Sequence, residues 1–212
     1  DNLHAALDAQ IDALDPHSRR VLRYASVLGR SFRTSVLDET LRGDDLVVDA
    51  ATIARLDGFL ERDGQGRLRF RNGMIRDAAY EGLAYRMRAR LHAAAGRAVE
   101  KLSEDLEADS DTLSLHFWRG GDDQRTWTYS RMAGERAARA YANVDAAVLY
   151  QRALDAARGL PSVTAEERLR LLVGLAEVRE NAGLYDAALD ALRQALALAS
   201  DDRERAAALL RQ

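Results

Sequence analysis

The chain has 212 residues, of which 47% are hydrophobic and 31% are charged, enough to bury the core of one large or two small domains. It contains no cysteine, which excludes disulfides, thiol catalysis and zinc–thiolate sites and favours a reducing, cytoplasmic location. No apolar run approaches the roughly 20 residues that cross a bilayer, so we expect no membrane partner, and the net charge of −3 argues against a chain that mainly holds nucleic acid.

The first expected helices carry clear signals at their ends. Asp15-Pro16 predicts a helix start, with the acid as N-cap and proline at the first helical position, and Gly29 ends that helix. A second helix is expected from about Thr34 to Arg42. A third is expected from about Asp49 to Arg62, because Ile53, Leu56 and Leu60 would share one face.

A turn and a strand follow the third helix. Asp63-Gly64-Gln65-Gly66 is a turn, and Arg67–Arg71 alternates strictly between arginine and apolar residues, as a half-buried strand does. Three helices and then a strand after a glycine turn is the chain order of a winged helix. We therefore expect residues 1–83 to form a winged-helix domain with flanking helices and a small β-hairpin.

The middle of the chain reads as a helical connector over residues 84–109. Helices are expected near Met74–Leu83 and Arg86–Leu106. The boundary between the two halves is marked by an acidic run, formed by Glu104, Asp105, Glu107, Asp109 and Asp111.

Residues 110–212 read as paired helices, which makes the fold mostly α. Helices are expected near residues 112–119, 124–141, 144–158, 165–182 and 185–199. In Leu172–Leu198, small residues occur where two helices must approach closely, at Ala176, Ala188 and Ala195, and large ones between them, at Leu172, Leu175, Tyr185 and Leu192, with Gly183 at the turn.

That segment resembles a tetratricopeptide repeat (TPR), whose period is about 34 residues. Ala146, Tyr150 and Ala153 repeat the spacing of Ala188, Leu192 and Ala195 at an offset of 42 residues, which is one period plus an insertion near Pro161–Arg168. We expect a TPR-like α–α solenoid, truncated at the C-terminus, that binds a protein or peptide. An array of α-hairpins without a strict period is the alternative.

Longer segments resemble a family of signalling proteins. Leu14-Asp15-Pro16, Arg20-Val21-Leu22 and Ala25–Phe32 are similar to the winged helix that follows the ATPase module in bacterial STAND-type ATPases of the AAA/NB-ARC kind. Phe70–Leu83, which contains Arg76-Asp77-Ala78-Ala79-Tyr80, is similar to the segment after the wing, and Arg90-Leu91-His92 and Ala133–Ala137 match as well. Lys101 is the only lysine among many arginines, which is typical of a GC-rich, actinobacterial genome.

The resemblance is closest to regulators in which a class III adenylate/guanylate cyclase precedes the ATPase and a repeat arm. It implies a regulatory segment in which the arm binds a partner or inducer and the winged helix controls the ATPase module, with ATP or ADP bound in the parent protein and no cofactor in this segment. A LuxR-type transcription regulator and a stand-alone TPR adaptor are the alternatives.

Asn72 has two interpretations. Many members of that family carry a histidine here that approaches the nucleotide phosphate, and asparagine could still donate a hydrogen bond to phosphate without becoming cationic. Alternatively, Asn72 only caps the helix that begins at Gly73.

The sequence gives no sign of catalysis. The histidines, His4, His17, His92 and His116, have no metal-ligand spacing, and no Gly-x-x-x-x-Gly-Lys-Ser/Thr loop is present. We expect neither a catalytic residue nor a metal site in this segment.

DNA binding is the main rival function. The wing offers Arg67, Arg69 and Arg71 on one face, with Arg76, Arg86, Arg88 and Arg90 beyond. The presumed recognition helix mixes Arg55 and Arg62 with Asp49, Asp57 and Glu61, which leaves no basic reading face. Nucleic acid is therefore not an expected partner.

The aromatic residues of the second half also allow two interpretations. Phe117, Trp118, Trp127, Tyr129 and Tyr150 can fill helix–helix interfaces. Alternatively, Trp118 or Trp127 anchors a bound peptide in a groove.

Overall fold

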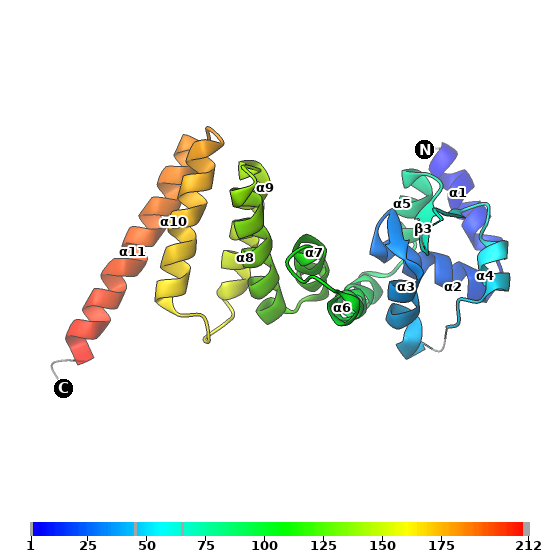
Figure 1. The fold of residues 1–212 in the computed structure, drawn as a ribbon, viewed down its shortest axis with the longest axis horizontal. Coiled ribbons are helices and arrows are strands. Elements are labelled where there is room, and N and C mark those ends of the chain that lie inside the picture. Colours follow the sequence, from blue (N-terminus) through cyan, green and yellow to red (C-terminus); the bar gives the residue numbers. More distant parts are fainter. Residues whose placement is uncertain (1, 45, 65, 210–212) are drawn as a thin grey trace. The chain divides into compact units, whose positions relative to one another are not determined.

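The computed structural model describes residues 2–44, 46–64 and 66–209 and divides the chain into two compact units, Asp1–Glu104 and Asp105–Gln212 (Figure 1). The described residues form eleven α-helices and one three-stranded antiparallel sheet, so the fold is mostly α. None of the helices in this described part is long and apolar enough to cross a membrane.

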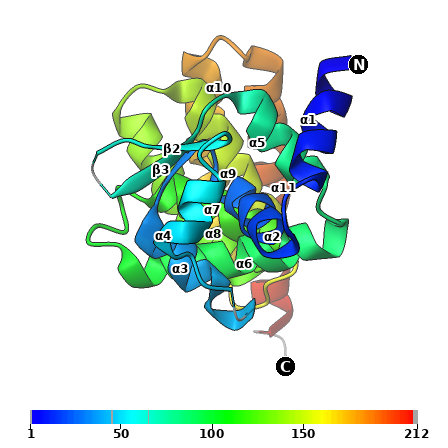
Figure 2. The same ribbon diagram turned by 90° about the vertical axis from the view of Figure 1, so that its right-hand side faces the viewer.

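The first unit packs six helices around a small sheet. The helices are α1 (Asn2–Asp12), α2 (Pro16–Ala25), α3 (Thr34–Leu41), α4 (Ala50–Arg55), α5 (Gly73–Glu81) and α6 (Tyr85–Leu102). The strands are β1 (Ser31–Arg33), β2 (Leu60–Arg62) and β3 (Arg67–Phe70), in the spatial order β1-β3-β2. Figure 2 shows β2 and β3 as a hairpin beside α4.

The helix start predicted at Asp15-Pro16 is confirmed by the cap of α2. The Asp15 carboxylate accepts hydrogen bonds from the backbone N–H groups of His17 and Ser18, and Pro16 occupies the first helical position of α2. This helix then buries Val21 and Leu22 completely. The N-cap and the apolar face both indicate a helix at this place, and for this reason the sequence predicted its start correctly.

The predicted helix over residues 49–62 is wrong in its second half. Asp49 caps α4 by accepting from the Thr52 N–H, but the helix ends at Arg55 and Leu60–Arg62 is strand β2. Leu60 pairs with Phe70 of β3 and is buried. Its apolar side chain fits a helical face as well as a strand, and only the partner strand decides between them.

The sheet and helix α6 also differ from the prediction. The sheet contains the predicted hairpin and, in addition, a third strand, β1, which pairs with β3. The turn before β3 has Gly64 and Gly66 at positive φ, while Gln65 lies outside the described residues. Helix α6, which the sequence assigns to a connector over 84–109, packs on α3 and buries Leu91 and Ala95 in the core of the first unit.

The second unit is a series of helices in which each packs on the next. They are α7 (Ser110–Gly120), α8 (Asp123–Arg139), α9 (Asn143–Ala157), α10 (Ala165–Asn181) and α11 (Tyr185–Leu209). Leu172, Leu175 and the small residues Ala176, Ala188 and Ala195 are buried as predicted. Tyr185 and Leu192, which the pattern assigns to the same interface, are exposed instead.

Two glycines let the helices approach Tyr150 of α9 from both sides. A Cβ atom added to Gly134 of α8 would lie 2.5 Å from Cδ1 of the Tyr150 ring. One added to Gly174 of α10 would lie 3.5 Å from Cε2 on the other edge. The ring is therefore held in a slot between α8 and α10 that needs glycine on the α8 side.

Candidate functional site

A groove of the second unit lies between α7 and α9, over the end of α8, and has a volume of about 520 Å³. Its walls combine apolar side chains such as Leu115 and Val148 with four charged ones: Asp111, Arg136, Asp145 and Arg152. Apolar walls with a few placed charges are typical of surfaces that bind proteins or peptides.

Trp118 of α7 lies beside this groove and is held in place by Arg152. The indole is 51% exposed, which is unusual for the largest apolar side chain. The Arg152 guanidinium stacks over its ring, 4.6 Å from the centroid, and donates a 2.8 Å hydrogen bond to the Ser114 hydroxyl. The pair is thus a fixed aromatic surface next to a groove, which costs little conformational entropy to bind.

Arg152 can still bind an anion. It is partly buried, and its hydrogen bond goes to the Ser114 hydroxyl, which carries no charge. Burial, and after it the neighbouring Arg119, lower the pKa of the Arg152 guanidinium, while Asp111 acts in the opposite direction. A carboxylate from a partner would offset both effects.

The other sequence-predicted anchor does not lie in this groove. Trp127 of α8 is 5% exposed and belongs to the core with Tyr150. Phe117 and Tyr129 are also buried and stack on one another, with ring centroids 5.7 Å apart. The core interpretation therefore fits these residues, and the anchor interpretation survives only for Trp118.

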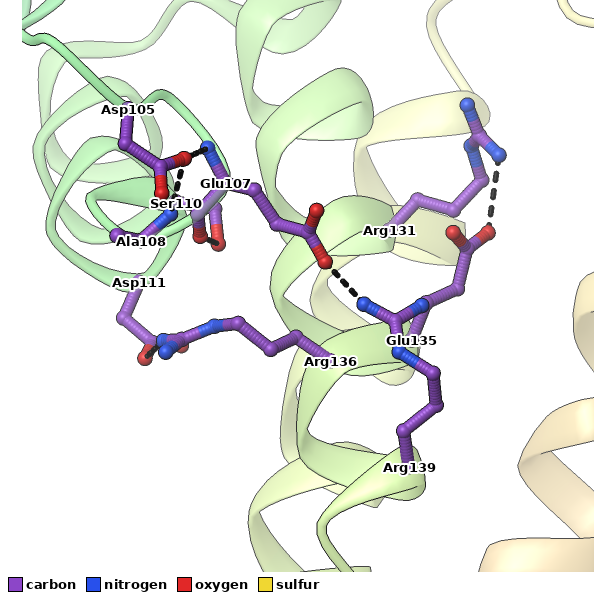
Figure 3. A network of polar contacts seen from close by, with 9 residues as sticks. All are labelled: Asp105, Glu107, Ala108, Ser110, Asp111, Arg131, Glu135, Arg136 and Arg139. Carbon is purple, nitrogen blue, oxygen red and sulfur yellow. Dashed lines mark hydrogen bonds and ion pairs between the residues drawn. The ribbon is translucent and has the colours of Figure 1, made fainter.

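The acidic run that the sequence singled out contributes one residue, Asp111, to the lining of the groove. Figure 3 shows Glu107 and Asp111 reaching the guanidinium groups of Arg139 and Arg136 on α8. Asp105 accepts from the backbone N–H groups of Glu107 and Ala108 and so shapes the turn before α7. The ion pairs of Glu107 and Asp111 link the start of α7 and the turn before it to α8, and Asp111 and Arg136 form a charged part of the groove.

A smaller hollow of about 200 Å³ opens between α8 and α10, over Tyr150. Its charged side chains already have partners in the same unit: Arg131 binds Glu135, Arg170 binds Glu166, and Glu167 closes the capping box of α10 with Thr164. Since its charges are already satisfied, it offers less to a partner than the groove between α7 and α9.

Asn72 in the first unit caps α5. Its side-chain oxygen accepts a 2.8 Å hydrogen bond from the Ile75 N–H. The exposed Arg30 guanidinium lies over the same helix start, 3.8 Å from where a Cβ on Gly73 would be. The capping role is therefore present in the structure, and the nucleotide contact stays a prediction.

The arginines on and beside strand β3 are paired with carboxylates of the same unit. Arg69 donates to Glu61 at 2.9 Å through Nε, and Arg71 lies 3.4 Å from Asp57. Arg67 lies 3.5 Å from Asp63. These ion pairs leave the β2–β3 hairpin little net positive charge for a DNA backbone.

The motif segment Arg76–Tyr80 ties α5 to its neighbours. Arg76 donates to the Ser26 carbonyl after α2 and stacks on the Tyr80 ring, and Arg88 of α6 stacks on the same ring. The Tyr80 hydroxyl is 3.1 Å from Nε2 of the buried His92. These contacts hold α5 against its neighbours, so the segment has a structural role.

The remaining histidines show no shared site. His17 is near the Val47 carbonyl in the first unit, while His116 is buried in the second. The side chain of His4 lies outside the described residues. Within those that are described, no cluster of three or more His, Asp or Glu could hold a metal ion.

Sequence reasoning missed Arg152 and Arg30. Arg152 is 34 residues from Trp118 in the chain, and Arg30 is 42 residues from Asn72. No local pattern links either pair, because only tertiary packing brings them together.

Comparison with known proteins adds no name to these sites: no family model, curated protein or solved structure matches the chain.

Proposed function

We propose that this chain is a non-catalytic regulatory and protein-interaction segment of a STAND-type signalling ATPase linked to a nucleotide cyclase. In this proposal the first unit is a winged helix and the second a TPR-like arm. The sequence resemblance supports the family. The three-stranded sheet with its β2–β3 hairpin supports the first assignment, and the helix pairs from α8 to α11 support the second.

The observation that carries the binding role is Trp118. It is a large, exposed aromatic side chain, held rigid by Arg152, at the edge of a 520 Å³ groove with apolar walls. Aromatic residues of this kind dominate the energy of protein interfaces. A partner would place an apolar side chain against Leu115 and Val148 and a carboxylate near Arg152.

For the arm to regulate the ATPase module, its partner must bind one state of the parent protein more tightly than another. In the closed state the first unit would pack over the nucleotide, with Asn72 and Arg30 near a phosphate. Both groups can donate hydrogen bonds to an anion at the start of a helix. Binding at the groove would favour the open state.

Two experiments test the proposal. Reading the coding sequence on both sides of the chain tests the family: a P-loop ATPase upstream supports it. A helix-turn-helix downstream without a cyclase would favour the transcription-regulator alternative, and no ATPase at all would favour the adaptor.

The groove is tested by selecting peptides from a random display library on the 212-residue chain. Binders are then titrated against Trp118→Ala and against Tyr85→Ala, which removes an exposed aromatic ring of the first unit. We expect Trp118→Ala to weaken binding at least tenfold and Tyr85→Ala to leave it unchanged.

A further inference from the structure

Helices α8 and α10 end in the same backbone motif. After each helix a backbone N–H donates to the carbonyl five residues earlier, at 2.9 Å and 2.8 Å, in the pairs Ala142–Ala137 and Leu184–Arg179. This is the hydrogen bond of a Schellman motif, in which the residue before the donor has positive φ and is usually glycine. After α10 that residue is Gly183, with φ at 75°, whereas after α8 it is Tyr141, with φ at 59°.

Tyr141 therefore occupies a position at which glycine costs least. A bulky residue in this conformation costs free energy, because its Cβ comes close to the following carbonyl oxygen. Tyr141 is also 85% exposed, so packing within the chain offsets little of that cost. Residues held in such conformations cluster at functional sites, where their placement serves a ligand.

Tyr141 lies at one end of the groove between α7 and α9, and Trp118 lies at the other. The chain neighbours of Tyr141, Ala140 and Ala142, both line the groove. The lining then follows α9 as far as Arg152, which stacks on the Trp118 ring. Ten residues of helix separate Ala142 from Arg152, which is about 15 Å. The groove thus has an exposed aromatic residue at each end.

The charges that α9 contributes to the groove differ between the two ends. Asp145, in the first turn of α9, is exposed and lines the groove near Tyr141. Arg152 lines it beside Trp118. Two helical turns separate the aspartate from the arginine by about 10 Å, and the apolar Val148 lies between them. This order favours an acidic group near Trp118 and a basic group near Tyr141.

We propose that the groove binds a peptide segment of a partner protein in one direction, with Trp118 and Tyr141 as its two anchors. This inference rests on the function proposed for the groove and adds its second anchor and the charges of its occupant. The segment carries an acidic side chain that meets Arg152, a basic one that meets Asp145, and an apolar one between them against Val148. The two charges are about 10 Å apart, which is about three residues of an extended peptide or about seven of a helical one.

The first test concerns the ring of Tyr141. Peptides selected from the display library are titrated against Tyr141→Asn, because asparagine tolerates positive φ but lacks the ring, and against Tyr141→Phe, which keeps the ring. We expect Tyr141→Asn to weaken binding at least about fivefold and to unfold at an equal or higher urea concentration than the unaltered chain. Tyr141→Phe should bind like the unaltered chain. Tyr185→Asn, at an exposed tyrosine of α11, is the matched control and should also leave binding unchanged.

The outcomes separate the second anchor from the function of the groove. If Trp118→Ala loses affinity and Tyr141→Asn does not, the second anchor is wrong and the proposed function stands. If neither variant loses affinity, both are wrong. If Tyr141→Asn unfolds the second unit, the tyrosine is structural and the inference is overturned.

A charge exchange tests the direction of the peptide. Asp145→Lys should weaken binding of a selected peptide about three- to tenfold, and replacing the basic residue of that peptide by glutamate should restore it. Asp186→Lys, in the first turn of α11, makes the same change of charge outside the groove and should leave binding unchanged. If the glutamate peptide binds Asp145→Lys no better than it binds the unaltered chain, the proposed direction is wrong.

Discussion

Replacement of Gly134 by alanine should destabilise the second unit, although alanine is the better helix former. The added Cβ would lie 2.5 Å and 2.6 Å from Cδ1 and Cε1 of Tyr150, and 3.4 Å from Cβ of Leu149. The ring can shift toward Gly174, where even an added Cβ would lie 3.5 Å from Cε2, so part of the overlap is relieved. Overpacking of this kind costs about 1–3 kcal/mol, and the higher helix propensity of alanine offsets about 1 kcal/mol of that cost. We expect a net loss of up to about 2 kcal/mol in the free energy of unfolding.

Gly174→Ala is the matched control. Its Cβ would make ordinary contact with the ring, 3.5 Å from Cε2, so we expect a gain of up to about 1 kcal/mol. Both variants are measured by urea unfolding followed through tryptophan fluorescence, which reports on the second unit because Trp118 and Trp127 are the chain's two tryptophans.

A double-mutant cycle identifies the cause. In a Tyr150→Leu background, which removes the ring edge, Gly134→Ala should cost at least about 1 kcal/mol less than it does alone. If Gly134→Ala stabilises the second unit as much as Gly174→Ala does, or if the Tyr150→Leu background leaves its cost unchanged, the slot between α8 and α10 does not hold the ring as described.

Three further predictions concern other residues. Burial, and secondly Arg119, lower the pKa of His116 from 6.5 to about 4. Between these two pH values His116 is protonated in the unfolded chain but stays neutral in the folded one. The second unit should lose about 2 kcal/mol between pH 7 and pH 5, a loss that His116→Gln should remove in urea titrations at both pH values. Asn72→Ala should cost the first unit about 1 kcal/mol by loss of the α5 cap, measured by circular dichroism, and Asn72→Asp should cost almost nothing. In the ATPase that we propose to contain this chain, both substitutions should speed nucleotide release if Asn72 touches phosphate. The chain should show no salt-sensitive binding to duplex DNA in fluorescence anisotropy. Tight binding that weakens steeply with salt would contradict the neutralisation of the arginines on the β2–β3 hairpin.

The sequence predicted those parts of the fold that local signals decide. Asp15-Pro16 and Asn72-Gly73 mark helix starts that depend on caps a few residues away, and both are present. Strands β1 and β2 are three residues long and exist only because β3 pairs with them. No window around Leu60 contains that information.

The candidate site was predictable in part for the same reason. The sequence singled out Trp118 and Trp127 as equivalent candidates. It could not separate them, because burial depends on which face of each helix packs against its neighbours. Arg152, which fixes the Trp118 ring, comes from the next helix but one. The acidic run around Glu107 was expected at a boundary, and its arginine partners on α8 became visible only in three dimensions.

The central claim is that the groove between α7 and α9 binds a protein partner through Trp118, and titration of library-selected peptides against paired variants tests it most directly. The account predicts that Trp118→Ala keeps the unfolding free energy of the second unit within about 1 kcal/mol, as expected for a surface substitution, and loses peptide affinity at least tenfold. It also predicts that Tyr85→Ala retains both. If peptides bind the two variants equally well, or if Trp118→Ala unfolds the unit, Trp118 is not an anchor and the proposed binding surface is wrong.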